Sequence, residues 1–243
     1  MAYTGSKYIE DDYLSIARGH IKDVTSIHKF GAVPAMSVNT TGTVWDVNDT
    51  LYPWSAWNTP GVLTIPAVNA SDTGKIVHVY GLDENYNMIN EQFTVSSAGT
   101  TTGTKTFGRV YRAFITDGAT NVDNINIQRS GATIARITAA KGQTLMAVYT
   151  VPYGYTGYLI KGTMTVAASA DATGDMFVRY SGQTSFRVGH SFEVSGTGGQ
   201  YTYEFGVPIQ IPMKSDIDVR ASVRSNNARV TAAFDLILVK GTR

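Results

Sequence analysis

The stretch "ARVTAAFDLIL", residues 228–238, alternates between apolar and polar positions along most of its length. Its apolar set is Val230, Ala232, Phe234, Leu236 and Leu238, and its polar set is Arg229, Thr231 and Asp235. Successive side chains of a β-strand point to opposite faces of a sheet, so this pattern predicts a strand with one buried face and one face in water. Phe234 and Leu236 are therefore expected in the core.

The same alternation recurs in three further stretches of the second half, residues 186–194, 201–211 and 217–223. In the second of these, Phe205 and Val207 fall on the apolar side and are also expected in the core. Pro208 and Pro212 have no amide donor, which favours an edge strand or strand ends. Short strands at regular spacing with glycine-rich turns predict an all-β protein, an antiparallel β-sandwich similar to a jelly roll.

The chain is predicted to have three parts. The spacing of apolar residues in "SKYIEDDYLSIARGH", residues 6–20, predicts a short helix, and we assign residues 1–35 to an N-terminal helix or arm. Residues 36–141 are predicted to form an irregular, tryptophan-rich segment and a smaller β unit, and residues 142–243 the β-sandwich, with the boundary at 141 left open. A helix this short is marginal alone, so its apolar side needs a partner surface.

Composition excludes several function classes. The formal net charge is +1, which argues against a nucleic-acid or membrane partner. The chain has no cysteine, so disulfides, cysteine-bound zinc and thiol catalysis are excluded. No apolar run approaches the ~20 residues that a membrane helix needs. The N-terminus lacks the basic start and apolar run of a signal peptide, so folding in a cytoplasm is expected.

No catalytic motif in the sequence is complete. The four histidines, His20, His28, His78 and His190, show no metal-ligand spacing. His190 falls on the apolar face of its predicted strand, where a hydrogen-bonded core histidine is expected rather than a metal ligand. "GHSFE", residues 189–193, departs from the G-x-S-x-G motif at its last position and lies in a predicted strand. "SIHK", residues 26–29, matches a two-residue pattern without its companion motifs. We predict that the protein is not an enzyme and has no cofactor or metal.

An aromatic cluster lies in "WDVNDTLYPWSAWN", residues 45–58. Aromatic side chains dominate cores and protein interfaces, and they also stack on sugar rings, so core, subunit interface and glycan platform are all open, the last being the least favoured. With the helix, the cluster supplies the residues predicted to contact a neighbouring subunit or partner: Ile9, Tyr13, Ile16, Phe30, Trp45, Tyr52, Trp54 and Trp57.

Several blocks of sequence, in this order, carry a resemblance to a known family. They are "HKFGAVPAM" (28–36), "VWDVNDTLYPW" (44–54), "GLDENYNMINEQFTV" (81–95), "KGQTLMAVYTVPYGYTGYL" (141–159), "YEFGVPIQIPMKSDIDVRA" (203–221) and "FDLILV" (234–239). Together they resemble a family of virion structural proteins of tailed bacteriophages, frequent in phages of marine and aquatic bacteria. The resemblance brings no catalytic residues.

The resemblance implies a capsid cement or decoration protein, folded in the host cytoplasm and then located in the virion. The expected partners are the chain itself, as a homotrimer, and the major capsid protein or other virion proteins. The alternatives are a tail or neck fibre or adsorption subunit, and a glycan-binding module. The tyrosine-rich stretch 141–162 then forms a buried strand, a tight turn and a return strand. Removal of residues 1–30 is expected to leave a folded β-domain that binds particles less well.

Overall fold

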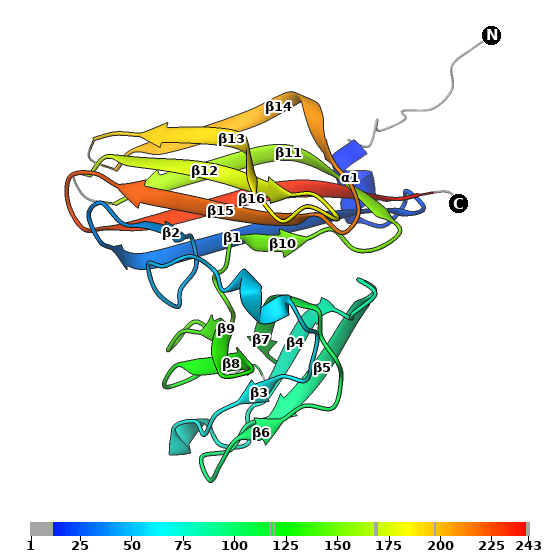
Figure 1. Ribbon diagram of the computed structural model, residues 1–243, viewed down its shortest axis with the longest axis vertical. Coiled ribbons are helices and arrows are strands. Elements are labelled where there is room, and N and C mark those ends of the chain that lie inside the picture. The colour runs from blue at the N-terminus through cyan, green and yellow to red at the C-terminus, as the bar shows by residue number, and fades with distance from the viewer. Residues whose placement is uncertain (1–11, 117, 119, 168–169, 197, 242–243) are drawn as a thin grey trace, which may run out of the picture.

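The computed structural model describes residues 12–116, 118, 120–167, 170–196 and 198–241, and almost all of its regular structure is β-strand. Figure 1 shows two β units that lie one beyond the other along the long axis of the molecule. The larger unit is an antiparallel sandwich. The smaller unit, residues 54–146, lies between strands β2 and β10 in the sequence and is called the inserted domain here. Among the described residues, no helix is long and apolar enough to cross a membrane.

The sandwich has two sheets of antiparallel strands. The first has the order β1 (Val24–Met36), β16 (Ala228–Lys240), β11 (Tyr155–Val166) and β14 (Gln200–Ile211). The second has the order β10 (Val148–Thr150), β15 (Asp216–Val223), β12 (Ala172–Arg179) and β13 (Arg187–Val194), with the short β2 (Thr41–Thr43) also paired to β15.

This strand order is that of a jelly roll. Counting β1 and β10 to β16 along the chain as strands 1 to 8, the sheets read 1-8-3-6 and 2-7-4-5. Every connection between consecutive strands passes from one sheet to the other, except the β12–β13 hairpin, which lies within the second sheet. This is the arrangement of two Greek keys. The predicted fold class, an all-β antiparallel sandwich of jelly-roll type with a short N-terminal helix, is confirmed.

Strand β16 lies in the centre of the first sheet, between β1 and β11, as its alternating pattern requires. Phe234 and Leu236 are buried between the sheets, so both predictions are confirmed. The predictions for Phe205 and Val207 are not: Phe205 is only half-buried, and Val207 is 85% exposed.

An irregularity in β14 explains this error. Leu159 pairs with Ile209, but Lys161 pairs with Glu204, so the four residues 205–208 of β14 lie opposite one residue of β11. Extra residues in one strand of a pair disrupt the ladder and change which face the side chains take. The expectation of an edge strand is correct, because β14 is the last strand of its sheet.

The inserted domain has two small sheets packed around a second core. One has the order β6 (Thr101–Thr102), β3 (Thr64–Ile65), β8 (Ile125–Arg129) and β9 (Ala132–Ile137). The other has the order β5 (Met88–Thr94), β4 (Ile76–Leu82) and β7 (Arg109–Ile115). Two short 3-10 helices, η1 (Trp54–Trp57) and η2 (Ala70–Asp72), precede β4.

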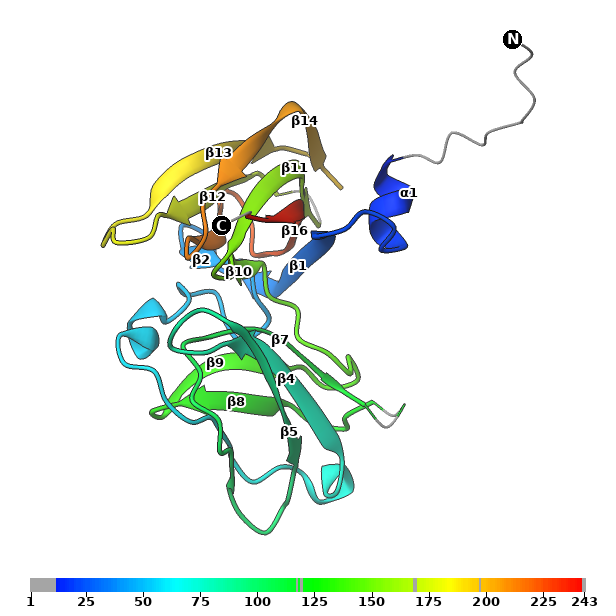
Figure 2. The ribbon, with the colours of Figure 1, turned by 90° about the vertical axis from the view of Figure 1, so that its right-hand side faces the viewer.

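The predicted division of the chain needs two corrections. Residues 24–35 are not part of an arm, because β1 pairs along its length with β16. The sandwich is not confined to residues 142–243, since it also contains β1 and β2. The helical prediction fits in its described part: helix α1 (Asp12–Ala17) lies beside the start of β1 (Figure 2).

The tyrosine-rich stretch forms a link between the two sheets of the jelly roll. Tyr149 in β10 is buried, a turn follows at residues 152–154, and β11 starts at Tyr155 in the other sheet. Gly154 has φ +79°, a left-handed conformation that favours glycine. The predicted strand, turn and return strand are therefore present.

Candidate functional site

The aromatic cluster predicted to contact a partner lies inside the chain, at the junction between the jelly roll and the inserted domain. Trp45, Tyr52, Trp54 and Trp57 are all buried, and the rings of Tyr52 and Trp54 are 4.7 Å apart. Trp57 Nε1 donates to Tyr52 Oη at 3.0 Å, and Trp54 Nε1 donates to Asp218 Oδ2 at 2.9 Å. These four residues are thus core residues. As partner contacts they are a wrong prediction, and they provide no exposed platform for a sugar.

A buried ion network joins the two units beside this cluster. Arg109 of β7 donates from Nε to Asp216 Oδ1 at 2.8 Å, and Arg179 of β12 donates from Nη2 to Asp216 Oδ2 at 2.6 Å. Arg220 Nε lies 2.8 Å from Asp218 Oδ2. Both aspartates belong to β15 and are buried. The network therefore fixes the inserted domain against the jelly roll.

The remaining predicted contact residues lie on the other side of the first sheet. Tyr13 of α1 is 58% exposed, and Ile16 is half-buried. Both line a pocket of about 200 Å³ over β1 and β16. Phe30 is half-buried in β1, and Ile9 lies outside the described residues. A partner contact through this region stays a prediction.

The catalytic motifs rejected on sequence do not assemble in the structure. The hydroxyl of Ser191 in "GHSFE" donates to Asp175 Oδ1 at 2.6 Å rather than to a histidine. His28 Nδ1 lies 2.5 Å from Asp235 Oδ1 on an exposed part of the sheet. Within the described residues, no three side chains of His, Cys, Asp or Glu form a metal-binding group.

His190 is not the hydrogen-bonded core histidine that the sequence predicts. It is half-buried among aromatic rings, and in the described part of the chain its Nε2 has no hydrogen-bond partner. The ring centroids of Phe192, Tyr203 and Phe205 lie 4.9 to 5.0 Å from that of His190. Burial lowers the pKa of His190. The neutral ring is thus part of an aromatic cluster that bridges β13 and β14.

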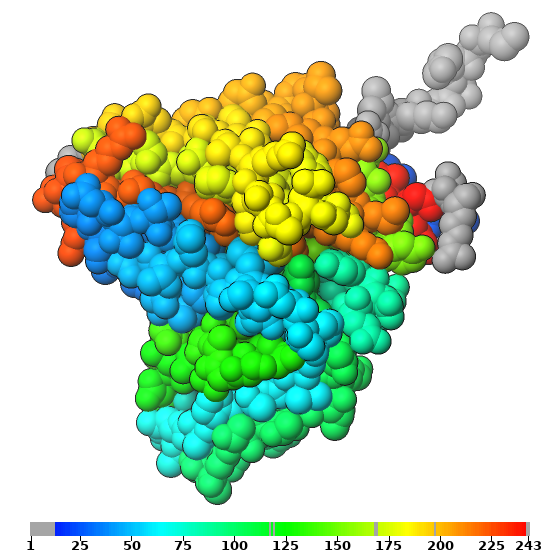
Figure 3. Space-filling view, viewed as in Figure 1, coloured from blue at the N-terminus to red at the C-terminus, as the bar shows by residue number. Residues whose placement is uncertain are grey.

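The outer side of this cluster is an exposed apolar surface. Val188 of β13 is 53% exposed, and Tyr203 and Val207 of β14 are 43% and 85% exposed. These residues define the β13/β14 edge, of which β14 (orange) lies on the side of the jelly roll away from the inserted domain (Figure 3). Each strand is the last of its sheet. Edge strands present unpaired backbone groups that can pair with another chain. The sequence missed this surface because it placed Val207 in the core.

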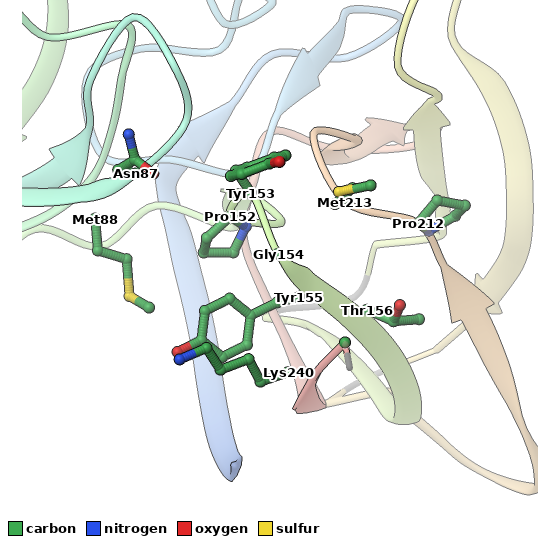
Figure 4. A pocket seen from close by; sticks show the side chains of 11 residues that line it. Asn87, Met88, Pro152, Tyr153, Gly154, Tyr155, Thr156, Pro212, Met213 and Lys240 are labelled. Carbon is green, nitrogen blue, oxygen red and sulfur yellow. The ribbon is translucent and has the colours of Figure 1, made fainter. Parts of the chain in front are cut away.

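A second surface with exposed apolar side chains is a groove of about 770 Å³ between the jelly roll and the inserted domain. Figure 4 shows the turn at residues 152–154 in the middle of the groove, with Met88 on one side and Pro212 on the other. Met88, Tyr153 and Met213 are partly exposed there. Thioether and aromatic side chains adapt to varied apolar partners.

The buried carboxyl group of Asp46 has no sign of a catalytic role but gives a test of the fold. Thr138 Oγ1 donates to its Oδ2 at 2.8 Å, and its Oδ1 has no partner among the described residues. Burial raises the pKa of Asp46 to about 6. Between pH 4 and 6 the unfolded state therefore loses its proton first, and the stability of the folded protein falls as the pH rises.

We expect Asp46→Asn to remove this pH dependence. The difference in unfolding free energy, variant minus wild type, should increase by about 2 kcal/mol from pH 4 to pH 7, since the pKa moves from 3.8 to about 6 and the unfolded group is already more than half ionised at pH 4. Urea unfolding at both pH values measures it. Asp123 is exposed, so Asp123→Asn is the control and should leave the difference unchanged. Equal behaviour of the two variants would contradict the assignment.

No protein-family model matches the sequence, and no curated protein matches it significantly. Similar solved structures include the top component of Cowpea mosaic virus, at 10% identity, a TM-score of 0.25 and coverage of 75% of this chain and 86% of that one. Another is infectious bursal disease virus strain Gx, at 10% identity, a TM-score of 0.28 and coverage of 90% and 72%. The cysteine protease and lectin-like domains of Cwp84 from Clostridium difficile match at 8% identity and a TM-score of 0.24, with coverage of 81% of this chain and 65% of that one. Scores this low identify neither a family nor a function.

Proposed function

We propose that this protein is a structural component of a bacteriophage particle, a cement or decoration protein that stabilises the head as a homotrimer. The observation that carries the proposal is the β13/β14 edge of the jelly roll, where Val188, Tyr203 and Val207 are exposed on the last strand of each sheet. Jelly rolls occur in viral capsid proteins, but also in lectins and cupins, so the fold alone is only an analogy. The ordered sequence blocks that resemble phage virion proteins add to it.

The described residues favour this function over the alternatives. The glycan-binding alternative was suggested by the tryptophans, and all three of them are buried. The alternative of an adsorption subunit of a tail or neck fibre that binds host glycans also relied on these tryptophans, so their burial weakens it as well. Closed, symmetric assemblies are the usual form of homo-oligomers, which is consistent with a trimer around the exposed edge.

The direct test is a cryo-EM map of particles of a phage that encodes this chain. We expect density for the jelly roll and inserted domain in many copies on the capsid surface. Density at the tail tip or neck alone would favour the fibre alternative, and particles without such density would contradict a structural role.

We expect Val207→Glu to abolish self-association and binding to particles without destabilising the fold. The side chain is 85% exposed, so the change in stability should stay within about 0.5 kcal/mol. A charge at the centre of an apolar interface is costly to desolvate. Val122→Glu is the matched control, because Val122 is 61% exposed on the inserted domain. Analytical ultracentrifugation and particle co-sedimentation measure both variants, and equal binding would contradict this use of the edge.

The arm hypothesis needs a shorter truncation than residues 1–30. Removal of residues 1–30 would also remove the first half of β1 and its pairing with β16, so it would not test the arm alone. We expect removal of residues 1–20 to preserve the melting temperature within a few degrees but to weaken particle binding, because it removes the exposed Tyr13 and Leu14. Unchanged binding would show that the helix has no role in contacts.

A further inference from the structure

A pocket of about 430 Å³ lies where β1 of the jelly roll meets β7 of the inserted domain. Its lining includes Lys29 and His28 of β1, Arg112 of β7, and Gln143 and Thr144 near the end of the inserted domain. None of its described lining residues is acidic. The pocket therefore gathers cationic and hydrogen-bonding groups without a carboxylate to balance them.

Lys29 is the unusual member of this set, because its side chain is a buried cation. The residue is only 7% exposed. Its ammonium group donates to the backbone carbonyl of Tyr111, which is its one hydrogen bond within the described part of the chain. An ammonium group has three donors, so this partner leaves donor capacity unused. A buried ion without an opposite charge is strongly disfavoured.

The groups around Lys29 do not provide the missing negative charge. The carboxylate of β16, the strand paired with β1, is that of Asp235, and it lies 2.5 Å from Nδ1 of His28. Arg112 on β7 adds a further positive charge, which together with burial lowers the pKa of Lys29 to about 7. Tyr111 stays neutral at physiological pH, since burial raises its pKa to about 12.

We propose that this pocket binds an oxyanion, a carboxylate or phosphate group, with the ammonium of Lys29 as its main ligand and Arg112 at the rim. Charge-assisted hydrogen bonds from ammonium and guanidinium groups are the strong ones for such ligands. The amide of Gln143 and the hydroxyl of Thr144 lie in the same lining and provide neutral donors. An anion restores the charge balance of Lys29 and so binds together with a proton above neutral pH.

The test uses the full-length protein and the acetylation of individual lysines, followed by mass spectrometry at pH 8. We expect inorganic phosphate or acetate, at matched ionic strength against chloride, to slow acetylation of Lys29 at least threefold and to leave the exposed Lys22 unchanged. Protection by phosphate alone or by acetate alone supports the site and identifies the group that fills it. Equal rates in all three salts overturn the proposal.

Variants give an independent measurement. Phosphate or acetate should raise the melting temperature of the wild type and of Lys22→Met above the value in chloride, and this increase should be lost in Lys29→Met. Arg112→Met should reduce it partly, and provides the comparison if Lys29→Met fails to fold. If the anions raise the melting temperature of Lys29→Met as much as that of the wild type, the anion acts elsewhere and the assignment is overturned. If Lys29→Met does not fold, the same result in Arg112→Met overturns it.

Discussion

Asp216→Ala is expected to lower the free energy of unfolding by about 3–5 kcal/mol, the range for breaking a buried ion pair by removing one partner. The carboxylate of Asp216 accepts hydrogen bonds from Arg109 at 2.8 Å and Arg179 at 2.6 Å, and from the hydroxyl of Thr150 at 2.6 Å. Its removal leaves two nearby guanidinium groups at the junction without a counter-charge. Asp216→Asn keeps the volume but not the charge, so a large part of the loss should persist.

Chemical denaturation followed by tryptophan fluorescence measures this effect, because all three tryptophans are buried around the junction. The control is Asp235→Ala, which removes a more exposed carboxylate paired with His28 and should cost less than about 1 kcal/mol. Equal losses in Asp216→Ala and Asp235→Ala would show that the network does not hold the two units together.

The sequence was sufficient for the fold class because the central strands carry their own pattern. In β16 every second residue is apolar and lies between the sheets, so alternation alone identified Phe234 and Leu236 as core residues. It failed for β14, where four residues without partners in β11 shift the pattern. A bulge of this kind has no signature in the alternation itself, although Pro208 indicated an edge strand.

Strand β1 was missed for a different reason. Its inner face carries Lys29 and Gly31 where alternation would require apolar side chains. A side chain at Gly31 would meet the backbone of Val44 at 2.0 Å and that of Ala147 at 2.5 Å, so close packing of three chain segments requires glycine there. The partner of β1 is β16, some 200 residues away in the sequence. Pairing over that distance depends on the whole jelly roll and cannot be deduced from a local pattern.

The candidate sites were the least predictable part. The tryptophans were recognised as a cluster, but their burial depends on the inserted domain folding back against β15, where Trp54 meets Asp218. Lys29 was noticed in the sequence only as the end of a rejected two-residue motif. A single lysine in an apolar stretch has no sequence signature of burial, and its surroundings arise from three segments that only the fold brings together.

We expect Lys29→Met to stabilise the protein at and below neutral pH, and the gain to disappear as the solution becomes alkaline. The pKa of Lys29 is lowered from 10.5 to about 7, chiefly by burial and then by Arg112. Between these values the unfolded state carries a proton that the folded state has lost, so the stability of the wild type rises with pH in this interval. Below about pH 7 both states are protonated, and the folded state bears the full cost of the buried charge.

Methionine has a similar length and no charge, so the variant lacks this dependence. The shift from 10.5 to about 7 corresponds to about 5 kcal/mol, so the variant-minus-wild-type difference in unfolding free energy should fall by several kcal/mol from pH 6.5 to 10.5. In the variant the carbonyl of Tyr111 loses the hydrogen bond from Lys29, which lowers the stability of the variant by the same amount at every pH. Urea unfolding across this interval measures it, with Lys22→Met as the exposed control. A difference independent of pH would mean that Lys29 is solvated in the folded protein.

If the dependence is found, the chain carries a destabilising cation at the pocket between its two units. Such a cost is expected where a polar group is retained to bind a ligand rather than to hold the fold.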